Sequence, residues 1–300
     1  MSDTPQNLLI RGVNWLGDAI MTLPAITRLR EALPKTRFTL LSHEKLAGLW
    51  AHTAHFDQVL TFAKGESPFV ISKRLKPKDF DAVLIFPNSF RTALEAWHAD
   101  IPRRIGYSGN WRSPLLTHAI APRPEAIPMQ KRMPIDIEYR HINHLKPQTF
   151  PESAHHIHQY LHLAQHLGAS SKPLAPQLER SENAPVFSAT EKPRPYIGLI
   201  AGAEYGPAKR WPTEHFIETA SQLIEQRQAH VLLLGGSGDQ ETAAEIADAL
   251  PADHHTNLAG QTTLPELVST LAACDAVLTN DTGPMHVAAA TGTPVIVPFG

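Results

Sequence analysis

The fold is decided near the N-terminus, where residues 8–18 read LLIRGVNWLGD. The first three residues are continuously apolar, as expected for a strand that is covered on both faces. Gly12 and Gly17 permit a tight turn, and helical periodicity then runs from Asp18 to Leu33. This order of strand, glycine turn and helix predicts the first unit of a doubly wound α/β domain.

The same alternation occurs twice along the chain, which predicts two Rossmann-like, doubly wound domains that face each other across a cleft. Further strands are expected at residues 38–41, 83–86, 196–200, 231–234, 276–278 and 295–297, and further helices at 213–226, 240–250 and 284–290. The proline-rich residues 171–195 are the expected linker, which leaves domains of residues 1–170 and 196–300. Because the chain stops directly after an apolar strand, we expect a complete C-terminal domain to extend further.

The composition excludes several classes of protein. Hydrophobic residues make up 42% of the chain and charged residues 19%, which is too apolar for a disordered chain. No apolar run approaches the ~18–20 residues of a membrane-spanning helix, and the first residues lack the pattern of a secretory signal. The single cysteine, Cys274, excludes a disulfide framework and fits a reducing cytosol.

The net charge of −2 conceals a division between the two halves of the chain. Residues 1–150 contain 20 Lys and Arg against 13 Asp and Glu, whereas residues 151–300 contain 7 against 16. One interpretation is that the first half binds something anionic. The alternative is a chance distribution of charges over solvated faces.

Asp18 stands at the expected start of the first helix. Either Asp18 caps the helix by accepting backbone N–H bonds, or its carboxylate is a general base beside the cleft. The two roles conflict, because amide groups at a helix start lower the pKa of a carboxyl and weaken it as a base. The surrounding stretch is neither a Walker loop nor a GxGxxG motif, which disfavours an NAD-dependent oxidoreductase.

Two motifs follow strands of the second series. Residues 202–212 read GAEYGPAKRWP, and Lys209 and Arg210 are two of only seven cations in residues 151–300. A cation pair on an acidic domain indicates an anionic ligand such as a phosphate, the alternative being a solvated pair in a loop. Residues 280–286 read NDTGPMH, in which proline suits a first helical turn whose amides can hold a pyrophosphate. In that motif Asp281 is either a helix cap or a ligand of a sugar hydroxyl.

Two weaker signals carry no site. The glycine-rich turn at residues 234–239 is common in nucleotide-binding domains and unspecific alone. His158, His162 and His166 recur on one helix face, but no cysteine or clear carboxylate completes a zinc site. We expect these histidines to form a helix face that is solvated or packed, and we expect no bound metal.

Taken together, these segments resemble the bacterial lipopolysaccharide heptosyltransferases, the ADP-heptose-using glycosyltransferases of family 9. The resemblance is carried by residues 14–18, 22–24, 88–91, 103–107, 202–212, 258–264 and 280–286. Residues 202–212 are most similar to members that add the second inner-core heptose. The chain departs from the family at Pro284, where leucine is common, and the family continues past Gly300.

The resemblance implies a GT-B fold with an acceptor-binding N-terminal domain and an ADP-heptose-binding C-terminal domain. Asp18 matches the family's proposed catalytic base, and Lys209 matches the lysine that contacts the donor phosphates. The donor-binding residues that it implies, together with candidates from the motifs themselves, are Glu204, Tyr205, Lys209, Arg210, Asp281, Thr282, Gly283 and His286. The candidates for acceptor binding are Asn14, Arg91, Arg103 and Arg104, with Arg112, Lys131 and Arg132 as further cations.

The expected function is inverting, metal-independent transfer of a heptose from ADP-heptose, with no cofactor. The expected acceptor is an anionic lipid A-core molecule, heptosyl-Kdo2-lipid A, at the inner-membrane surface. We expect a cytoplasmic monomer, peripheral to the inner membrane, that binds no nucleic acid. The alternatives are a relative that acts at another step, such as addition of the first heptose, another nucleotide-sugar transferase of this fold, and a non-catalytic nucleotide-sugar-binding protein.

Overall fold

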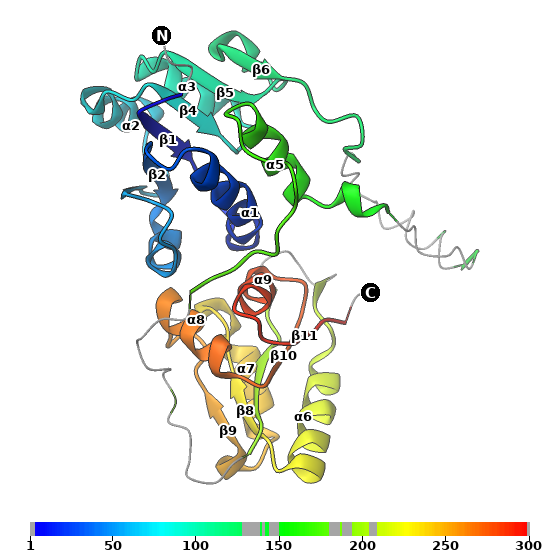
Figure 1. Ribbon diagram of the computed structural model, residues 1–300. Coiled ribbons are helices and arrows are strands. Elements are labelled where there is room, and N and C mark those ends of the chain that lie inside the picture. The colour runs from blue at the N-terminus through cyan, green and yellow to red at the C-terminus, as the bar shows by residue number, and fades with distance from the viewer. Residues whose placement is uncertain are drawn as a thin grey trace.

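The computed structural model describes residues 4–127, 139, 142–143, 150–179, 187, 194–203 and 209–298 (Figure 1). The described residues form two parallel β-sheets, each covered by helices on both faces. The two lobes are stacked, with the first sheet above and the second below in Figure 1. The doubly wound α/β architecture expected from the sequence is therefore confirmed.

The first sheet has the strand order β3-β2-β1-β4-β5-β6, and all its neighbours are parallel. Its strands are β1 (Asn7–Arg11), β2 (Arg37–His43), β3 (Gln58–Phe62), β4 (Ala82–Ile85), β5 (Arg103–Tyr107) and β6 (His118–Ile120). Leu9 of the central strand pairs with Thr39 on one side and Val83 on the other. The carboxyl ends of β1, β4 and β5 consequently meet at one edge of the sheet, where ligands bind in this fold.

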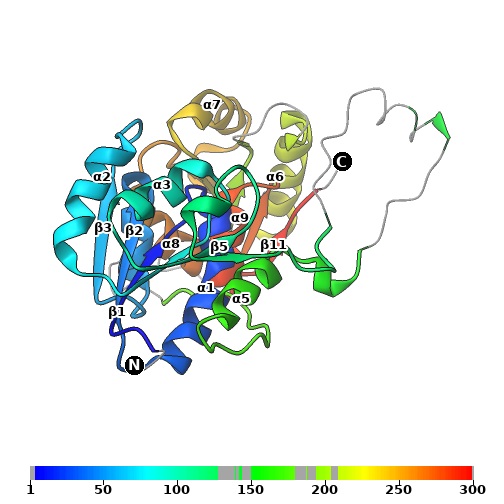
Figure 2. The ribbon, with the colours of Figure 1, turned by 90° about the horizontal axis from the view of Figure 1, so that it is seen from above.

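Alternate residues of each strand face opposite layers of helices. Leu8 and Ile10 pack toward α1 (Leu16–Ala32), α5 (Ile157–Gln165) and the short helix η1 (Glu44–His52). Leu9 packs instead toward α2 (Pro68–Leu75) and α3 (Phe90–His98). Figure 2 shows these two layers on opposite sides of the first sheet.

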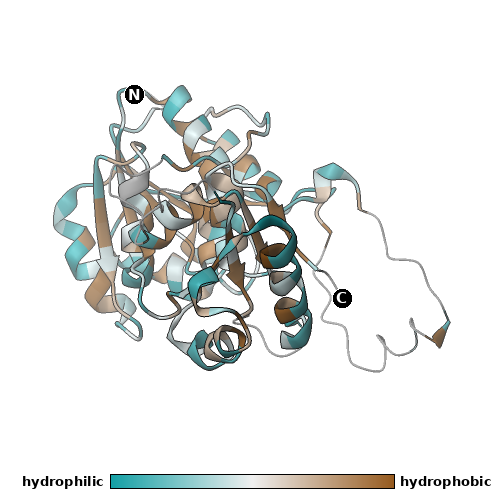
Figure 3. Cartoon of the chain, turned by 90° about the horizontal axis from the view of Figure 1, so that it is seen from below, coloured by the Kyte–Doolittle hydropathy of each residue, from teal (hydrophilic) through white to brown (hydrophobic). Residues whose placement is uncertain are grey.

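The second sheet has the order β11-β10-β7-β8-β9 and is also parallel. Its strands are β7 (Tyr196–Ile200), β8 (His230–Leu233), β9 (His255–Asn257), β10 (Ala276–Thr279) and β11 (Val295–Ile296). One face packs on α6 (Thr213–Arg227) and α7 (Gln240–Asp248), and the other on α8 (Leu264–Ala273) and α9 (Gly283–Ala290). Figure 3 shows the strands as mainly hydrophobic and the helices as alternating between hydrophilic and hydrophobic turns.

Short helical turns connect these elements. They are η2 (Lys76–Lys78), η3 (Ser113–Leu115), η4 (Glu152–Ala154), η6 (Ser237–Asp239) and η7 (Ala252–His254). The predicted helix at 18–33 begins two residues earlier, at Leu16, because Gly17, which was expected in the turn, is the second residue of the helix. Among the helices that the structure describes, none has the length and apolarity needed to cross a bilayer.

The lobes meet through α1 against α9 and η1 against α8, and buried residues of both lobes belong to one hydrophobic cluster (Figure 1). Three glycines make this close approach possible. A Cβ added at Gly17 would lie 2.6 Å from His286 Cδ2, and one added at Gly283 would lie 2.9 Å from Leu16 Cβ. A Cβ at Gly48 would likewise lie 2.6 Å from Pro265 Cδ.

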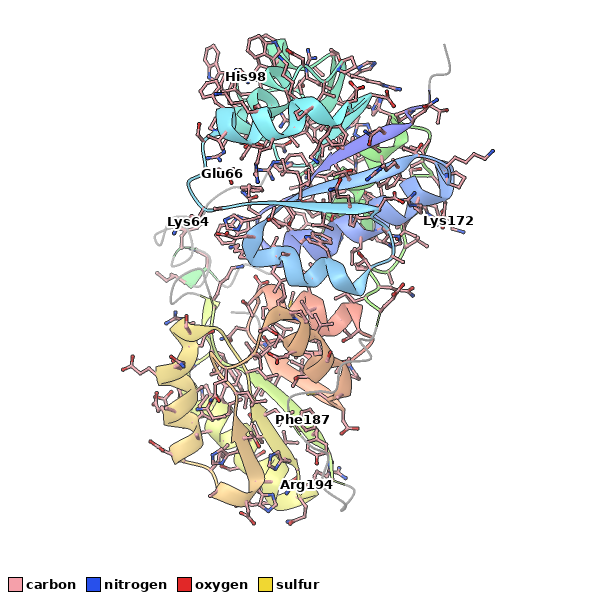
Figure 4. All side chains as sticks on the ribbon, turned by 90° about the vertical axis from the view of Figure 1, so that its left-hand side faces the viewer. Lys64, Glu66, His98, Lys172, Phe187 and Arg194 are labelled. Atoms are coloured by element: carbon pink, nitrogen blue, oxygen red, sulfur yellow. The ribbon has the colours of Figure 1, made fainter. Side chains whose placement is uncertain are left out.

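Part of the expected linker, residues 171–195, is described. The Arg28 Nε donates to the Lys172 carbonyl at 3.0 Å, which holds that part beside the first lobe (Figure 4). The Leu178 amide donates to the Ala290 carbonyl at 2.9 Å, so the chain has reached the second lobe by that residue. Residues 180–186 and 188–193 lie outside the described residues.

Candidate active site

A cavity of about 280 Å³ opens at the carboxyl edge of the first sheet. The turn after β1, the loop after β4, the end of β5 and the helix α5 surround it. Its lining is mainly amide, hydroxyl and aromatic: Val13, Asn14, Trp15, Asp18, Phe86, Pro87, Asn88, Ser89, Tyr107, His156, Gln159 and Tyr160. Such a lining suits a hydroxyl-rich ligand, because amides bind hydroxyls and aromatic rings cover apolar ring faces.

Asp18 is the third residue of α1 and lines this cavity. Trp15 occupies the cap position, so the interpretation of Asp18 as the helix cap is wrong. Burial raises the pKa of Asp18 above that of an ordinary aspartate, and the nearby His156 and His286 partly oppose the shift. The net shift is thus upward, opposite to the lowering expected at a helix start, and the raised pKa makes Asp18 a stronger proton acceptor.

His156 lies beside Asp18 on the α5 side of the cavity. Burial lowers the pKa of its imidazole, and the charge of Asp18 acts in the opposite direction. The His156 Nε2 lies 3.1 Å from the Tyr160 hydroxyl, and the two rings meet edge to face. The Tyr107 hydroxyl donates to the Gln159 carbonyl at 2.8 Å, so the cavity wall is fixed by bonds within the first lobe.

Arg112 is buried behind this wall. Its guanidinium donates to the carbonyls of Tyr107, at 2.7 Å, and Pro87, and to the Asn88 Oδ1 at 3.4 Å. Burial lowers the pKa of Arg112 to about 10. The residue therefore holds the loops after β4 and β5 in place and does not extend into the cavity, contrary to the expectation that it contacts an acceptor.

Arg91 forms its described hydrogen bonds within the first lobe. Its Nε donates to Glu95 Oε1 at 3.1 Å, and a second nitrogen donates to the Glu66 carbonyl. Glu95 is buried and also accepts from Arg11 Nε at 2.8 Å. Part of the positive charge counted in the first half is thus neutralised internally.

Arg103 and Arg104 begin β5, so they lie at the opposite edge of the sheet from the cavity. Arg104 donates to the carbonyls of Leu115 and Ile101, at 2.7 and 2.6 Å. Arg103 donates to the His166 carbonyl at 3.1 Å. The structure does not bring these two arginines together with Asp18. Lys131 and Arg132 lie outside the described residues.

In the second lobe, Lys209 Nζ and Asp281 Oδ2 form an ion pair at 2.5 Å. Asn280, fully buried, holds the two loops that carry this pair. Its Nδ2 donates to the Ala201 carbonyl at 2.6 Å, and its Oδ1 accepts from the Trp211 amide at 3.0 Å. The sequence analysis quoted Asn280 within a motif but gave it no role.

Arg210 donates to the Ala203 carbonyl at 3.3 Å, and Glu204 and Tyr205 lie outside the described residues. Thr282 is the N-cap residue of α9 and Gly283 is its first residue. The helix therefore begins one residue before the predicted start at 284. The N-terminus of α9 lies beside the start of α1, because a Cβ added at Gly283 would lie 2.9 Å from Leu16 Cβ.

His286 connects the two halves of the site. Its ring rests against Gly17 of the first lobe, one residue before Asp18. Burial lowers the pKa of His286, while Asp281 and Asp18 both act to raise it and Lys209 acts to lower it. The structure therefore brings Asp18, His286, Asp281 and Lys209 together at the interface of the lobes, as the sequence predicts for a shared site.

His162 of α5 and His166, the residue that caps its C-terminus, contact neighbouring rings. The Tyr107 hydroxyl lies 2.9 Å from His162 Nδ1, and the rings of His162 and His166 meet edge to face. Within the described ranges, no three His, Cys, Asp or Glu side chains are grouped closely enough to hold a metal ion.

Two facing Rossmann-like lobes, with a carboxylate on one and a lysine and helix start on the other, are the arrangement of a GT-B glycosyltransferase. The family model described as glycosyltransferase family 9 (heptosyltransferase) matches residues 69–300. The chain belongs to this family.

Several relatives support the assignment. The chain is 31% identical to lipopolysaccharide heptosyltransferase 2 of Escherichia coli K12, over 98% of this chain and 82% of that protein. It is 30% identical to lipooligosaccharide heptosyltransferase 2 of Haemophilus influenzae, over 98% and 83%. The solved structure of E. coli ADP-heptose lps heptosyltransferase II matches with a TM-score of 0.80 and 30% identity, covering 98% of this chain and 85% of that one. The two-lobed fold is thus shared with a heptosyltransferase.

Proposed function

We propose that the chain transfers a heptose from ADP-heptose to the heptosyl-Kdo2-lipid A inner core of lipopolysaccharide, the activity of heptosyltransferase II. The names of the E. coli and H. influenzae relatives support this donor and this step. The observation that carries the proposal is the contact between the His286 ring, on α9 of the second lobe, and Gly17 of the first lobe, one residue before Asp18. A base on one lobe and a donor site on the other then share one reaction centre.

The reaction begins with the acceptor hydroxyl in the cavity, hydrogen-bonded to the Asp18 carboxylate. The hydroxyl oxygen attacks the anomeric carbon of the donor as the bond from that carbon to the pyrophosphate breaks, which inverts the configuration. Asp18 takes the hydroxyl proton, and its raised pKa favours this transfer.

Groups of the second lobe stabilise the leaving ADP. Lys209, Arg210 and the amides of Thr282 and Gly283 would hold the pyrophosphate, and Asp281 would bind a hydroxyl of the heptose. The Lys209–Asp281 pair is half-exposed, so a phosphate can replace the carboxylate as the partner of Lys209. These fixed positive groups act most strongly on the charge that develops as the bond breaks, so no metal ion or cofactor is needed.

The acceptor is proposed to enter from the first lobe. Asn14 lines the cavity and would contact the acceptor sugar. Arg91, Arg103 and Arg104 would act only on charged groups outside the cavity, since their described bonds lie away from it. In this proposal residues 1–170 and 196–300 are the acceptor and donor domains, and the protein is a cytoplasmic monomer at the inner-membrane surface.

A transfer assay with ADP-heptose and two truncated acceptors, one with and one without the first heptose, tests this function. Transfer only to the acceptor that carries the first heptose is the expected result. Transfer only to the acceptor without it would indicate the preceding step, and ADP binding without any transfer would indicate a non-catalytic protein. Loss of activity in EDTA that added metal restores would contradict the metal-independent mechanism.

A further inference from the structure

Large apolar side chains are exposed on one part of the first lobe. Trp111 is 91% exposed, and four others expose nearly half of their surface. These five residues, here called the aromatic patch, are Phe69 and Val70 of α2, Phe90 and Trp97 of α3, and Trp111. Soluble proteins seldom leave such side chains uncovered in a group, so the patch indicates a surface that binds something.

The members of the patch lie on neighbouring elements, since α2 packs against α3. The Phe69 ring lies 5.1 Å from that of His98, the neighbour of Trp97, so α2 and α3 carry one surface. At the other end, Asn110 Nδ2 donates to the Asn88 carbonyl at 2.6 Å, which fixes the turn of Trp111 beside the start of α3. Phe69 and Trp111, which are 42 positions apart in the sequence, thus lie on adjoining elements.

The turn that carries Trp111 has an unusual backbone. Gly109, Asn110 and Trp111 have φ values of 105°, 50° and 59°, all in the left-handed region. A large side chain rarely adopts this conformation, which is maintained only where the surrounding structure enforces it. Here it holds a tryptophan that is 91% exposed, and packing among the described residues does not account for the conformation.

Cations are frequent in the chain segment that carries Phe69 and Val70 of the patch. Residues 64–78 contain five cations, Lys64, Lys73, Arg74, Lys76 and Lys78, and one acid, Glu66. Arg74 pairs with Glu66 at 3.0 Å, and Lys76 pairs with Asp100. Figure 4 shows Lys64, Glu66 and His98 on the same side of the first lobe. Aromatic side chains next to lysine and arginine are the combination that binds the interface of an anionic bilayer.

The patch also adjoins the cavity. Asn88 and Ser89 line the cavity, and Phe90 of the patch follows them directly. A lipid held in a bilayer at the patch could therefore extend its head group into the cavity without leaving the membrane. A second copy of the chain is a poorer occupant, because it would bring two clusters of lysines together.

We propose that the aromatic patch docks the protein on a bilayer with anionic head groups, with Trp97 and Trp111 inserted at the interface. The inference rests on the proposed function, in which the acceptor is a lipid at the inner-membrane surface. It adds the surface through which the cavity reaches that acceptor.

Co-sedimentation of the full chain with vesicles tests the proposal. Wild type should bind vesicles of phosphatidylethanolamine and phosphatidylglycerol, with a blue shift of tryptophan emission, and bind phosphatidylcholine vesicles weakly. The double variant Trp97→Ser/Trp111→Ser should partition at least roughly tenfold less. The control Ile296→Ser, which removes a 59% exposed residue from the second lobe, should bind like wild type.

Activity on two acceptors separates docking from catalysis. The double variant should act normally on a soluble acceptor without acyl chains and lose activity on the acceptor embedded in vesicles. Equal vesicle binding by wild type and double variant would overturn the docking proposal. So would a dimer of the wild type that the double variant abolishes. A wild type that binds vesicles but transfers to no acceptor would refute the proposed function while leaving the docking surface supported.

Discussion

Gly17 offers a direct test of how the lobes form one site. In the change Gly17→Ala, the new methyl group would lie 2.6 Å from His286 Cδ2 and 3.1 Å from His286 Nε2. Either the imidazole must rotate or α1 and α9 must separate, since the contact joins two different lobes. Overpacking of this kind costs about 1–3 kcal/mol. If this free-energy cost destabilises the arrangement of the two lobes in which transfer occurs, kcat/KM decreases by roughly 5- to 150-fold.

Steady-state kinetics with ADP-heptose, together with thermal unfolding, measures the effect. Gly238→Ala is the matched control, because a Cβ there meets no atom within 4 Å. A double-mutant cycle with His286→Ala isolates the contact, since the cost of Gly17→Ala should disappear when the imidazole is absent. Wild-type kcat/KM in Gly17→Ala would refute the reasoning, as would an equal loss in the presence and absence of His286.

Three further predictions concern the charged groups. Lys209→Ala should weaken ADP binding by about 10- to 100-fold in calorimetry, because a charge-assisted bond is lost; an unchanged Kd would remove Lys209 from the phosphate site. In the pH profile of kcat/KM, the fall in activity at low pH should have an apparent pKa above 3.8, the ordinary value for aspartate, since activity needs ionised Asp18 and burial raises its pKa. A kcat/KM that stays constant as the pH is lowered to 3.8 would contradict this. Arg112→Lys should raise the acceptor KM roughly tenfold and leave donor affinity unchanged, because lysine cannot hold the loops after β4 and β5 together. Equal changes for both substrates would indicate a general loss of structure.

Much of the fold was predictable from continuous apolar runs. The strand Tyr196–Ile200 was predicted with its observed limits, because a mainly apolar run follows the charged, proline-rich residues 192–195 and ends before Ala201 and Gly202. The strands Gln58–Phe62 and Arg103–Tyr107 were not predicted. The first mixes polar and apolar residues and the second begins with two arginines, so neither stands out as a buried run.

The site was only partly predictable. Asp18 and Lys209 follow glycine-containing segments after β1 and β7, and that local rule places both beyond the carboxyl ends of strands. His156 reaches the cavity only because α5 packs on α1 across well over a hundred residues of sequence, which periodicity does not reveal. Arg103 and Arg104 were chosen by counting charges, and a count does not say to which edge of a sheet a side chain belongs.

The role of Asp18 as the base is tested most directly by the variant Asp18→Asn, which keeps the size of the side chain and removes its charge. Single-turnover transfer should slow at least a hundredfold, roughly the contribution of a positioned general base, while ADP-heptose binds as in wild type. Transfer at the wild-type rate by this variant would contradict the account.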